Sequence, residues 1–159
     1  MRKSIQYILY GLTLLVTLVL PAERTDVGEL LPVELVSVSA AGGKVTIRTD
    51  TGNSGTGENV TRAYRDLEES ASGKIFLDTV DYLVLEESKE IPLENLRQYL
   101  KSGIRVCRGE EGLNLEEAAL YLATHRPQVR LKELNTVTDA PVLVEMENGF
   151  ALLKKDRKK

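Results

Sequence analysis

The sequence has little of the chemistry that most catalytic and metal sites need. Its 159 residues include one cysteine, one histidine and no tryptophan. A single cysteine excludes an intramolecular disulfide, and no recurring spacing of histidine, cysteine and carboxylate residues indicates a metal site. Lysine and arginine number 21 against 24 acidic residues, so no concentrated basic face for nucleic acid is expected. We therefore expect a protein that is not an enzyme, with no catalytic or metal-binding residues, no cofactor and no nucleic-acid partner.

Long apolar runs are also missing, except at the amino terminus. Arg2 and Lys3 precede an apolar run that begins at Ile5, and acidic residues outnumber basic ones over 23–29. This charge order keeps the amino terminus in the cytoplasm. We expect residues 4–20 to cross the membrane, with residues 1–22 acting as a signal anchor and the rest of the chain outside the cytoplasm. Cleavage after Ala22 would instead give a secreted protein, but it would require Leu20 where a small residue is preferred.

Residues 23–153 have the pattern of one extracytoplasmic domain. Their apolar period switches repeatedly between two and 3.6, which is typical of interleaved strands and helices. The predicted fold class is α+β, a single mixed-sheet domain in the order β-β-α-β-α-β-α-β-β. The strands are expected over 33–39, 44–51, 75–85, 104–108, 141–146 and 150–153, and the helices over 59–67, 92–103 and 114–126.

Turn residues support several of these boundaries. Gly42-Gly43 and Asn148-Gly149 are suited to tight hairpins, and the second closes the hairpin from Pro141 to Leu153. Asn59 or Glu58 lies at the start of one predicted helix, and Asn114 is placed to cap another. The basic tail, residues 154–159, follows the last strand. It is suited either to anionic lipid or an acidic partner, or to being a solvated end.

Two short motifs have both a chemical and a structural interpretation. Asp50-Thr51-Gly52 is the tripeptide with which aspartic proteases present a carboxylate, but here Arg48-Thr49 precede it, so a turn after a strand is favoured. The glycines at 52, 55 and 57 lie between a strand and a helix, where backbone amides can cradle an anion. No lysine follows at a phosphate-binding position, so a flexible connection is the expected structure.

The remaining candidates for a functional role are single residues that belong to no longer motif. Asp78 and Asp81 lie three apart on a predicted strand and therefore face opposite ways, with Thr79 between them. His125 lies at a helix end, where a capping role is expected. Cys107 shares a face with Arg105 on a predicted strand, which leaves both an exposed thiol and a buried one open.

The order of blocks from Glu23 to Leu100 resembles the amino-terminal domain of the Ger(x)C family, the C subunit of spore germinant receptors. Three blocks carry the resemblance. The first is Asp26 and Glu29-Leu30 before the strand residues Leu35-Val36; the second is Gly57 followed by Ala63 and Leu67; the third is Lys74-Ile75-Phe76-Leu77 leading into Val80-Asp81-Tyr82-Leu83-Val84-Leu85.

This resemblance implies a non-catalytic protein that contacts a protein partner at the cell or spore membrane of a spore-forming bacterium. Arg24 stands where the family carries its lipid-bearing cysteine, so the apolar segment would have to serve as the tether. The family also continues through two further domains, and we expect this chain to be a freestanding relative of the first. A related role in spore germination or sporulation is the resulting hypothesis. An exported enzyme or small-ligand-binding domain with an unrecognised site is the alternative.

Overall fold

The computed structural model describes residues 30–86, 91, 93–147 and 149–153. The predicted anchor, residues 1–22, and the basic tail, residues 154–159, lie outside the described residues. Over the part that is described, no helix is long and apolar enough to span a bilayer.

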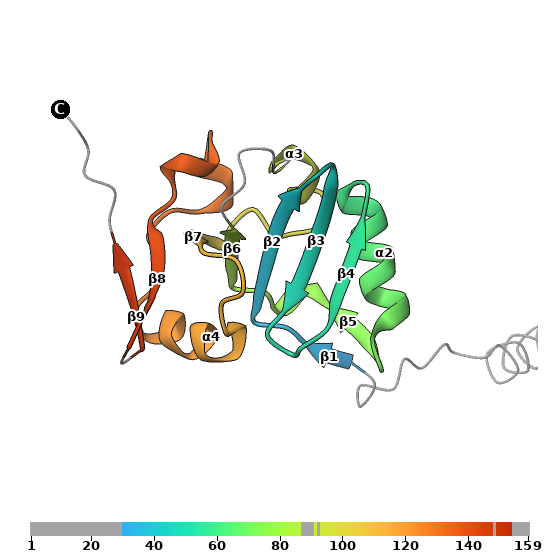
Figure 1. Ribbon diagram of the computed structural model, residues 1–159, viewed down its shortest axis with the longest axis horizontal. Helices are drawn as coiled ribbons and strands as arrows, with labels where there is room; N and C mark the ends of the chain where they lie inside the picture. Colours follow the sequence, from blue (N-terminus) through green and yellow to red (C-terminus); the bar gives the residue numbers. More distant parts are fainter. Residues whose placement is uncertain (1–29, 87–90, 92, 148, 154–159) are drawn as a thin grey trace, which may run out of the picture.

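A mixed seven-stranded sheet forms the centre of the molecule, in the order β4-β3-β2-β6-β7-β8-β9 (Figure 1). Its middle strands β2, β6, β7 and β8 are parallel, whereas β3, β4 and β9 join by antiparallel pairing. The predicted α+β class is therefore confirmed. The strands are β2 (Leu35–Ala41), β3 (Lys44–Thr49), β4 (Ser54–Gly57), β6 (Tyr82–Glu86), β7 (Arg105–Gly109), β8 (Val142–Met146) and β9 (Gly149–Leu153).

Each face of the sheet has its own core, because alternate residues of β2 and β6 point to opposite sides. Val36, Val38 and Leu83 belong to a cluster that includes helix α2 (Val60–Ser70), whereas Leu35 and Val84 pack with helix α4 (Leu115–Thr124). The two helices thus cover different faces of the sheet, with α2 over β3 and β4 and α4 across the strands from β2 to β9 (Figure 1).

Local sequence signals explain the ends of these elements. The Asn59 side chain accepts a hydrogen bond from the Arg62 amide at 2.9 Å, and Asn114 caps α4 by accepting from the Glu117 amide at 3.4 Å. Gly149 has a φ of 124°, which only glycine adopts readily, and it follows the turn between β8 and β9. The predicted caps and the closing hairpin are confirmed.

The predicted strand over 75–85 is wrong in its middle. The chain forms β5 (Lys74–Phe76), then a 3₁₀ turn (Leu77–Thr79), and only then β6. The Thr79 hydroxyl holds this turn, since it lies 2.9 Å from the Val33 carbonyl and 2.8 Å from the Phe76 carbonyl. β5 pairs instead with β1 (Leu30–Pro32) in a separate parallel ribbon that the sequence pattern did not predict.

The helix predicted from Pro92 to Gly103 is also shorter than expected. Helix α3 covers Leu93–Leu96, and Pro92 itself lies outside the described residues. After Leu96 the chain tightens, because the Gln98 and Tyr99 amides bond three residues back, to Asn95 and Leu96. Leu96 and Leu100 are nevertheless both buried. The apolar spacing therefore predicted which residues enter the core but not the length of the helix.

Candidate functional site

The glycine-rich stretch is a packed strand and not a flexible anion-binding loop. Ser54–Gly57 forms the edge strand β4, paired with β3, so the predicted flexible connection is wrong. A Cβ on Gly55 would lie 2.3 Å from the Ala63 carbonyl oxygen, and one on Gly57 would lie 2.5 Å from the Ala63 amide. Glycine is required at these positions because the backbone of α2 lies directly on the strand.

Asp50-Thr51-Gly52 forms a turn after a strand, as predicted. The Asp50 carboxylate accepts a hydrogen bond from the Glu34 amide at 3.1 Å and so ties the end of β3 to the start of β2. The Thr49 hydroxyl lies 2.8 Å from the Thr51 hydroxyl and 3.2 Å from the Asn53 amide, which closes the turn. These contacts give the tripeptide a structural role.

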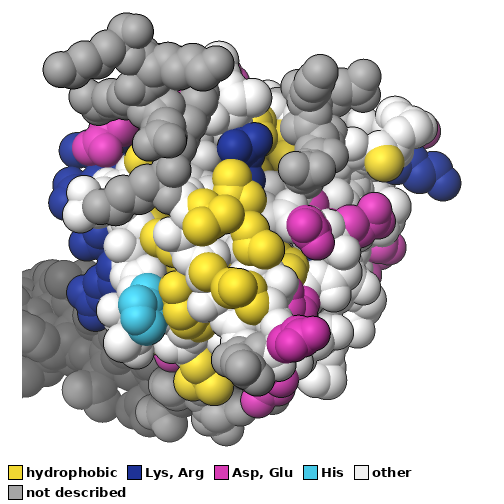
Figure 2. Space-filling model, turned by 60° about the vertical axis from the view of Figure 1, so that its left-hand side comes forward, with side chains coloured by type: hydrophobic (Ala, Val, Ile, Leu, Met, Phe, Trp, Pro, Cys, Tyr) yellow, Lys and Arg dark blue, Asp and Glu magenta, His cyan; other side chains and the backbone are white. Residues whose placement is uncertain are grey.

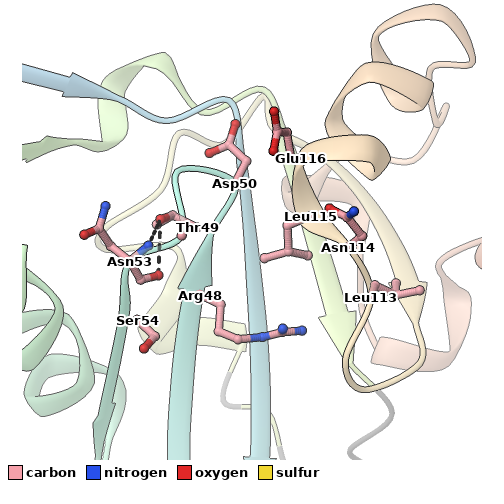
Figure 3. A pocket seen from close by; sticks show the side chains of 10 residues that line it. Arg48, Thr49, Asp50, Asn53, Ser54, Leu113, Asn114, Leu115 and Glu116 are labelled. Atoms are coloured by element: carbon pink, nitrogen blue, oxygen red, sulfur yellow. Dashed lines mark hydrogen bonds between the residues drawn. The ribbon is translucent and has the colours of Figure 1, made fainter.

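A cleft of about 360 Å³ lies between this turn and the start of α4 (Figure 3). Asp50 and Glu116 lie at one end of the cleft and Arg48 at the other (Figure 3). Burial raises the pKa of Asp50, and the amide hydrogen bond from Glu34 partly opposes that rise. The second carboxylate oxygen of Asp50 is buried without a partner among the described residues. Of the two carboxylates that line the cleft, the one that is exposed is that of Glu116.

The guanidinium of Arg48 is already paired. It bonds to Glu86, which is 2% exposed at the end of the central strand β6. Ser37 on β2 is the cross-strand neighbour of Arg48, so the guanidinium passes over the small residues of β2 to reach Glu86. Sequence analysis missed this pair. A glutamate directly after four buried residues, Tyr82–Leu85, is the signal that was available.

The positions of the remaining single-residue candidates are explained by the fold. Asp78 lies in the 3₁₀ turn and Asp81 in the loop after it, and Thr79 supports that turn. His125 is exposed at the end of α4 and stacks on Tyr121 with ring centroids 4.3 Å apart, which agrees with the predicted cap. Cys107 is fully buried, and burial raises its pKa to about 12.

The closing hairpin carries an exposed apolar surface. Because β8 joins β7 through a single register pair, most of the hairpin has no further strand beside it. On one side of it Leu143 is buried against α4; on the other, Met146 is 60% exposed and Leu153 is 55% exposed. We call this other side the hairpin face. It consists of Val142, Val144, Met146, Ala151 and Leu153.

Apolar exposure continues from the hairpin onto the neighbouring helix. Tyr121 and the half-buried Phe150 are in ring contact, with centroids 5.9 Å apart, and Leu120 of α4 is 69% exposed. Figure 2 shows hydrophobic side chains gathered on this side of the molecule, with acidic side chains along one border and the histidine on the opposite border. β9 is the last strand of the seven-stranded sheet.

Within the described ranges, no group of three or more histidine, cysteine or carboxylate residues is arranged to hold a metal ion. Comparison with protein-family models, curated proteins and solved structures finds no match to this chain. The resemblance to the Ger(x)C family therefore stays a prediction.

Proposed function

We propose that this chain is a non-catalytic, membrane-tethered protein that acts outside the cytoplasm as an interaction or assembly module. The observation that carries the proposal is the exposed apolar surface of the closing hairpin. Met146 and Leu153 are both more than half exposed on one face of a sheet, next to the sheet edge. Apolar surface in such a position is typical of protein interaction sites.

The amino-terminal sequence supports the tether. Arg2, Lys3 and the apolar run after them favour a single membrane pass with residues 23–153 outside. The Ger(x)C resemblance favours a cell or spore membrane and a role in germination or sporulation. The partner, in this proposal, is another protein at the same membrane.

The test combines fractionation with site-specific crosslinking in the native membrane. A photoreactive residue at Met146 should give a covalent protein adduct in the membrane fraction, and one at Leu153 should give the same adduct. Glu69, exposed on α2 and remote from the hairpin in sequence, is the matched control site and should give none. A soluble species beginning at Glu23 would refute the tether, and equal labelling from Glu69 would refute the interaction surface.

A small-ligand-binding or enzymatic role is the second candidate, and the cleft beside Asp50 favours it. Its volume of about 360 Å³ is within the range of ligand pockets, roughly 300–1,000 Å³. Its two carboxylates, on Asp50 and Glu116, suit a ligand with cationic or hydrogen-bond-donor groups. Thermal shift against a panel of amines and amino sugars tests it. A ligand that raises the melting temperature of the native chain, and loses that effect in Asp50→Asn, would favour this role over the interaction module.

A further inference from the structure

Two arginines face each other across neighbouring strand segments near the end of α4. Arg105, the first residue of β7, and Arg130 form an isolated antiparallel bridge. The backbone bonds lie on the flanking residues, at the Val106 and Leu131 amides, so the arginines form a non-hydrogen-bonded pair with Cα atoms about 4.5 Å apart. Arg105 lies beside Tyr82, which packs in the core under α4. Both arginine side chains therefore project on the α4 side of the sheet.

A third arginine joins this pair at the end of the helix. The Arg105 guanidinium donates to the Pro127 carbonyl at 2.7 Å, directly after Arg126 in the chain. Arg126 is exposed, and its Nε donates to the Ala123 carbonyl in the last turn of α4 at 3.4 Å. We call Arg105, Arg126 and Arg130 the arginine cluster.

No carboxylate within the described ranges forms an ion pair with the arginine cluster. Glu133 lies beside it, but its carboxylate accepts from the Arg130 amide at 3.3 Å and not from a guanidinium. A helix end favours a cation, which accounts for Arg126. Like charges directly opposite each other on two strands are destabilising, so the Arg105–Arg130 pair lowers the stability of the fold. An external anionic group would offset this cost.

The arginine cluster is continuous with the exposed apolar surface. The Phe150 and Tyr121 rings lie 5.9 Å apart, and the Tyr121 and His125 rings are stacked at 4.3 Å. Leu120, next to Tyr121, is 69% exposed. Figure 2 shows that lysine and arginine side chains lie beyond the histidine that borders the hydrophobic side chains. A ligand on the apolar surface therefore reaches the cluster.

The distribution of charge selects the kind of ligand. Glu116 and Glu117 are exposed in the first turn of α4, on the same helix face as Leu120. The surface along α4 thus has carboxylates at one end, apolar side chains in the middle and arginines at the other end. An anionic membrane or a nucleic acid is negative throughout and would be repelled by the carboxylate end. A protein segment can present negative charge at one end only.

From these observations we infer that the partner is a protein segment whose apolar residues lie on α4 and the hairpin and whose carboxylates bind the arginine cluster. This inference rests on the proposed function, since it names the chemistry of the partner at the α4 side of the same apolar surface. The apolar contacts supply most of the affinity, and the arginines fix the orientation of the segment.

Carbodiimide coupling in membranes that carry the full chain tests for the partner's carboxylate. Arg130→Lys keeps the positive charge and adds an amine, which carbodiimide joins to a carboxylate in direct contact. Mass spectrometry of the crosslinked peptides should find an amide between position 130 and an acidic residue of another protein, with apolar residues beside it. Arg65→Lys, exposed on α2, is the matched control and should give no intermolecular amide.

The wild-type chain gives the background from its natural lysines. No amide above that background overturns the inference, and so does an equal amide from Arg65→Lys or an amide only to carboxylates of this chain. Binding to anionic lipid is also distinguished, because a lipid phosphate forms no stable amide.

Stability supplies an independent readout on the solubilised full chain. Arg130→Glu replaces the like-charged pair with an ion pair to Arg105 and should raise the melting temperature by about 2 °C. Arg65→Glu should not raise it, because that side chain has no arginine opposite it on a neighbouring strand. A lower melting temperature in Arg130→Glu would mean that the arginine supports the fold and would contradict the inference.

Charge reversal should also weaken partner binding. A photoreactive residue at Leu120 should give an adduct whose yield falls roughly tenfold in Arg126→Glu with Arg130→Glu, since two favourable charge contacts become repulsive. Arg62→Glu with Arg65→Glu is the matched control on α2 and should leave the yield unchanged. An unchanged yield in the reversal at 126 and 130 overturns the role of the arginine cluster.

The two proposals fail differently. A photo-adduct from Met146 to another protein, without the amide from Arg130→Lys, refutes the acidic segment and leaves the interaction module standing. Absence of both refutes both.

Discussion

The backbones of Gly55 and Leu67 are in direct contact, since a Cβ on Gly55 would lie only 2.2 Å from the Leu67 amide nitrogen. Gly55 is on the edge strand and Leu67 is fully buried in α2, so neither backbone can retreat without opening the core. The glycines of this segment set the distance between helix and sheet.

Gly55→Ala should therefore lower the free energy of unfolding by about 3 kcal/mol, at the upper end of the usual cost of overpacking. Urea denaturation followed by circular dichroism measures the change. Gly103→Ala is the matched control, because nothing lies within 4 Å of its added Cβ, and it should change stability by less than about 0.5 kcal/mol. Similar effects at the two positions would mean that α2 does not lie on β4 as described.

The Arg48–Glu86 pair gives a second prediction, on stability. Arg48→Met leaves the buried Glu86 carboxylate without its partner, and we expect a loss of about 3 kcal/mol. This figure is at the low end for a buried pair because the Arg48 side chain is 30% exposed. Adding Glu86→Leu should recover most of the loss, since the unpaired charge is then gone.

The control for this prediction is Arg62→Met. Arg62 pairs with Glu58 at 3.2 Å, but both side chains are more than half exposed. The expected loss is below about 1 kcal/mol. If the double variant at 48 and 86 were as unstable as Arg48→Met alone, the guanidinium would be stabilising the fold through its packing and not through its charge.

The sequence correctly predicted those elements whose residue pattern is compatible with only one local structure. The closing hairpin, in which Met146 pairs with Gly149, and the cap at Asn114 depend on neighbouring residues alone, and both agree with the structure. The continuous strand through Asp78 failed because Thr79 bonds to Val33, 46 positions away. No local pattern reports such a contact.

The structure of the glycine segment and the pairing of Arg48 with Glu86 also depend on contacts between residues far apart in the sequence, so local sequence patterns did not predict them. Gly55 and Gly57 have the composition of a loop, and only the nearness of Ala63 explains them as strand residues. Arg48 and Glu86 are 38 positions apart, and their meeting depends on the sheet order β3-β2-β6.

Asp50 gives a prediction on pH. Burial raises its pKa above the usual 3.8, so the folded chain holds this proton more tightly than the unfolded chain. Stability at this site is therefore greatest below the unfolded pKa and falls as the pH rises through the folded one. In Asp50→Asn that fall should disappear, so the variant should gain stability relative to wild type between pH 3 and neutral pH.

The measurement is urea denaturation at several pH values. Asp50→Ala serves as the control, because it also removes the acceptor for the Glu34 amide and should be less stable than Asp50→Asn at every pH. A constant difference between wild type and Asp50→Asn across this range would show that the carboxylate is not desolvated by folding.

Cys107 gives the last prediction, on thiol reactivity. Its side chain is fully buried and burial raises its pKa to about 12, so at pH 8 the native thiol is both covered and protonated. Labelling by a disulfide reagent should require unfolding and should be slower, by on the order of 10³-fold or more, than labelling of an exposed thiol. The double variant Cys107→Ser with Leu120→Cys provides that exposed thiol on the same fold. The rate at Cys107 should rise steeply with urea, whereas the rate at position 120 should not. Fast, urea-independent labelling of Cys107 would mean that strand β7 opens locally, without loss of the fold.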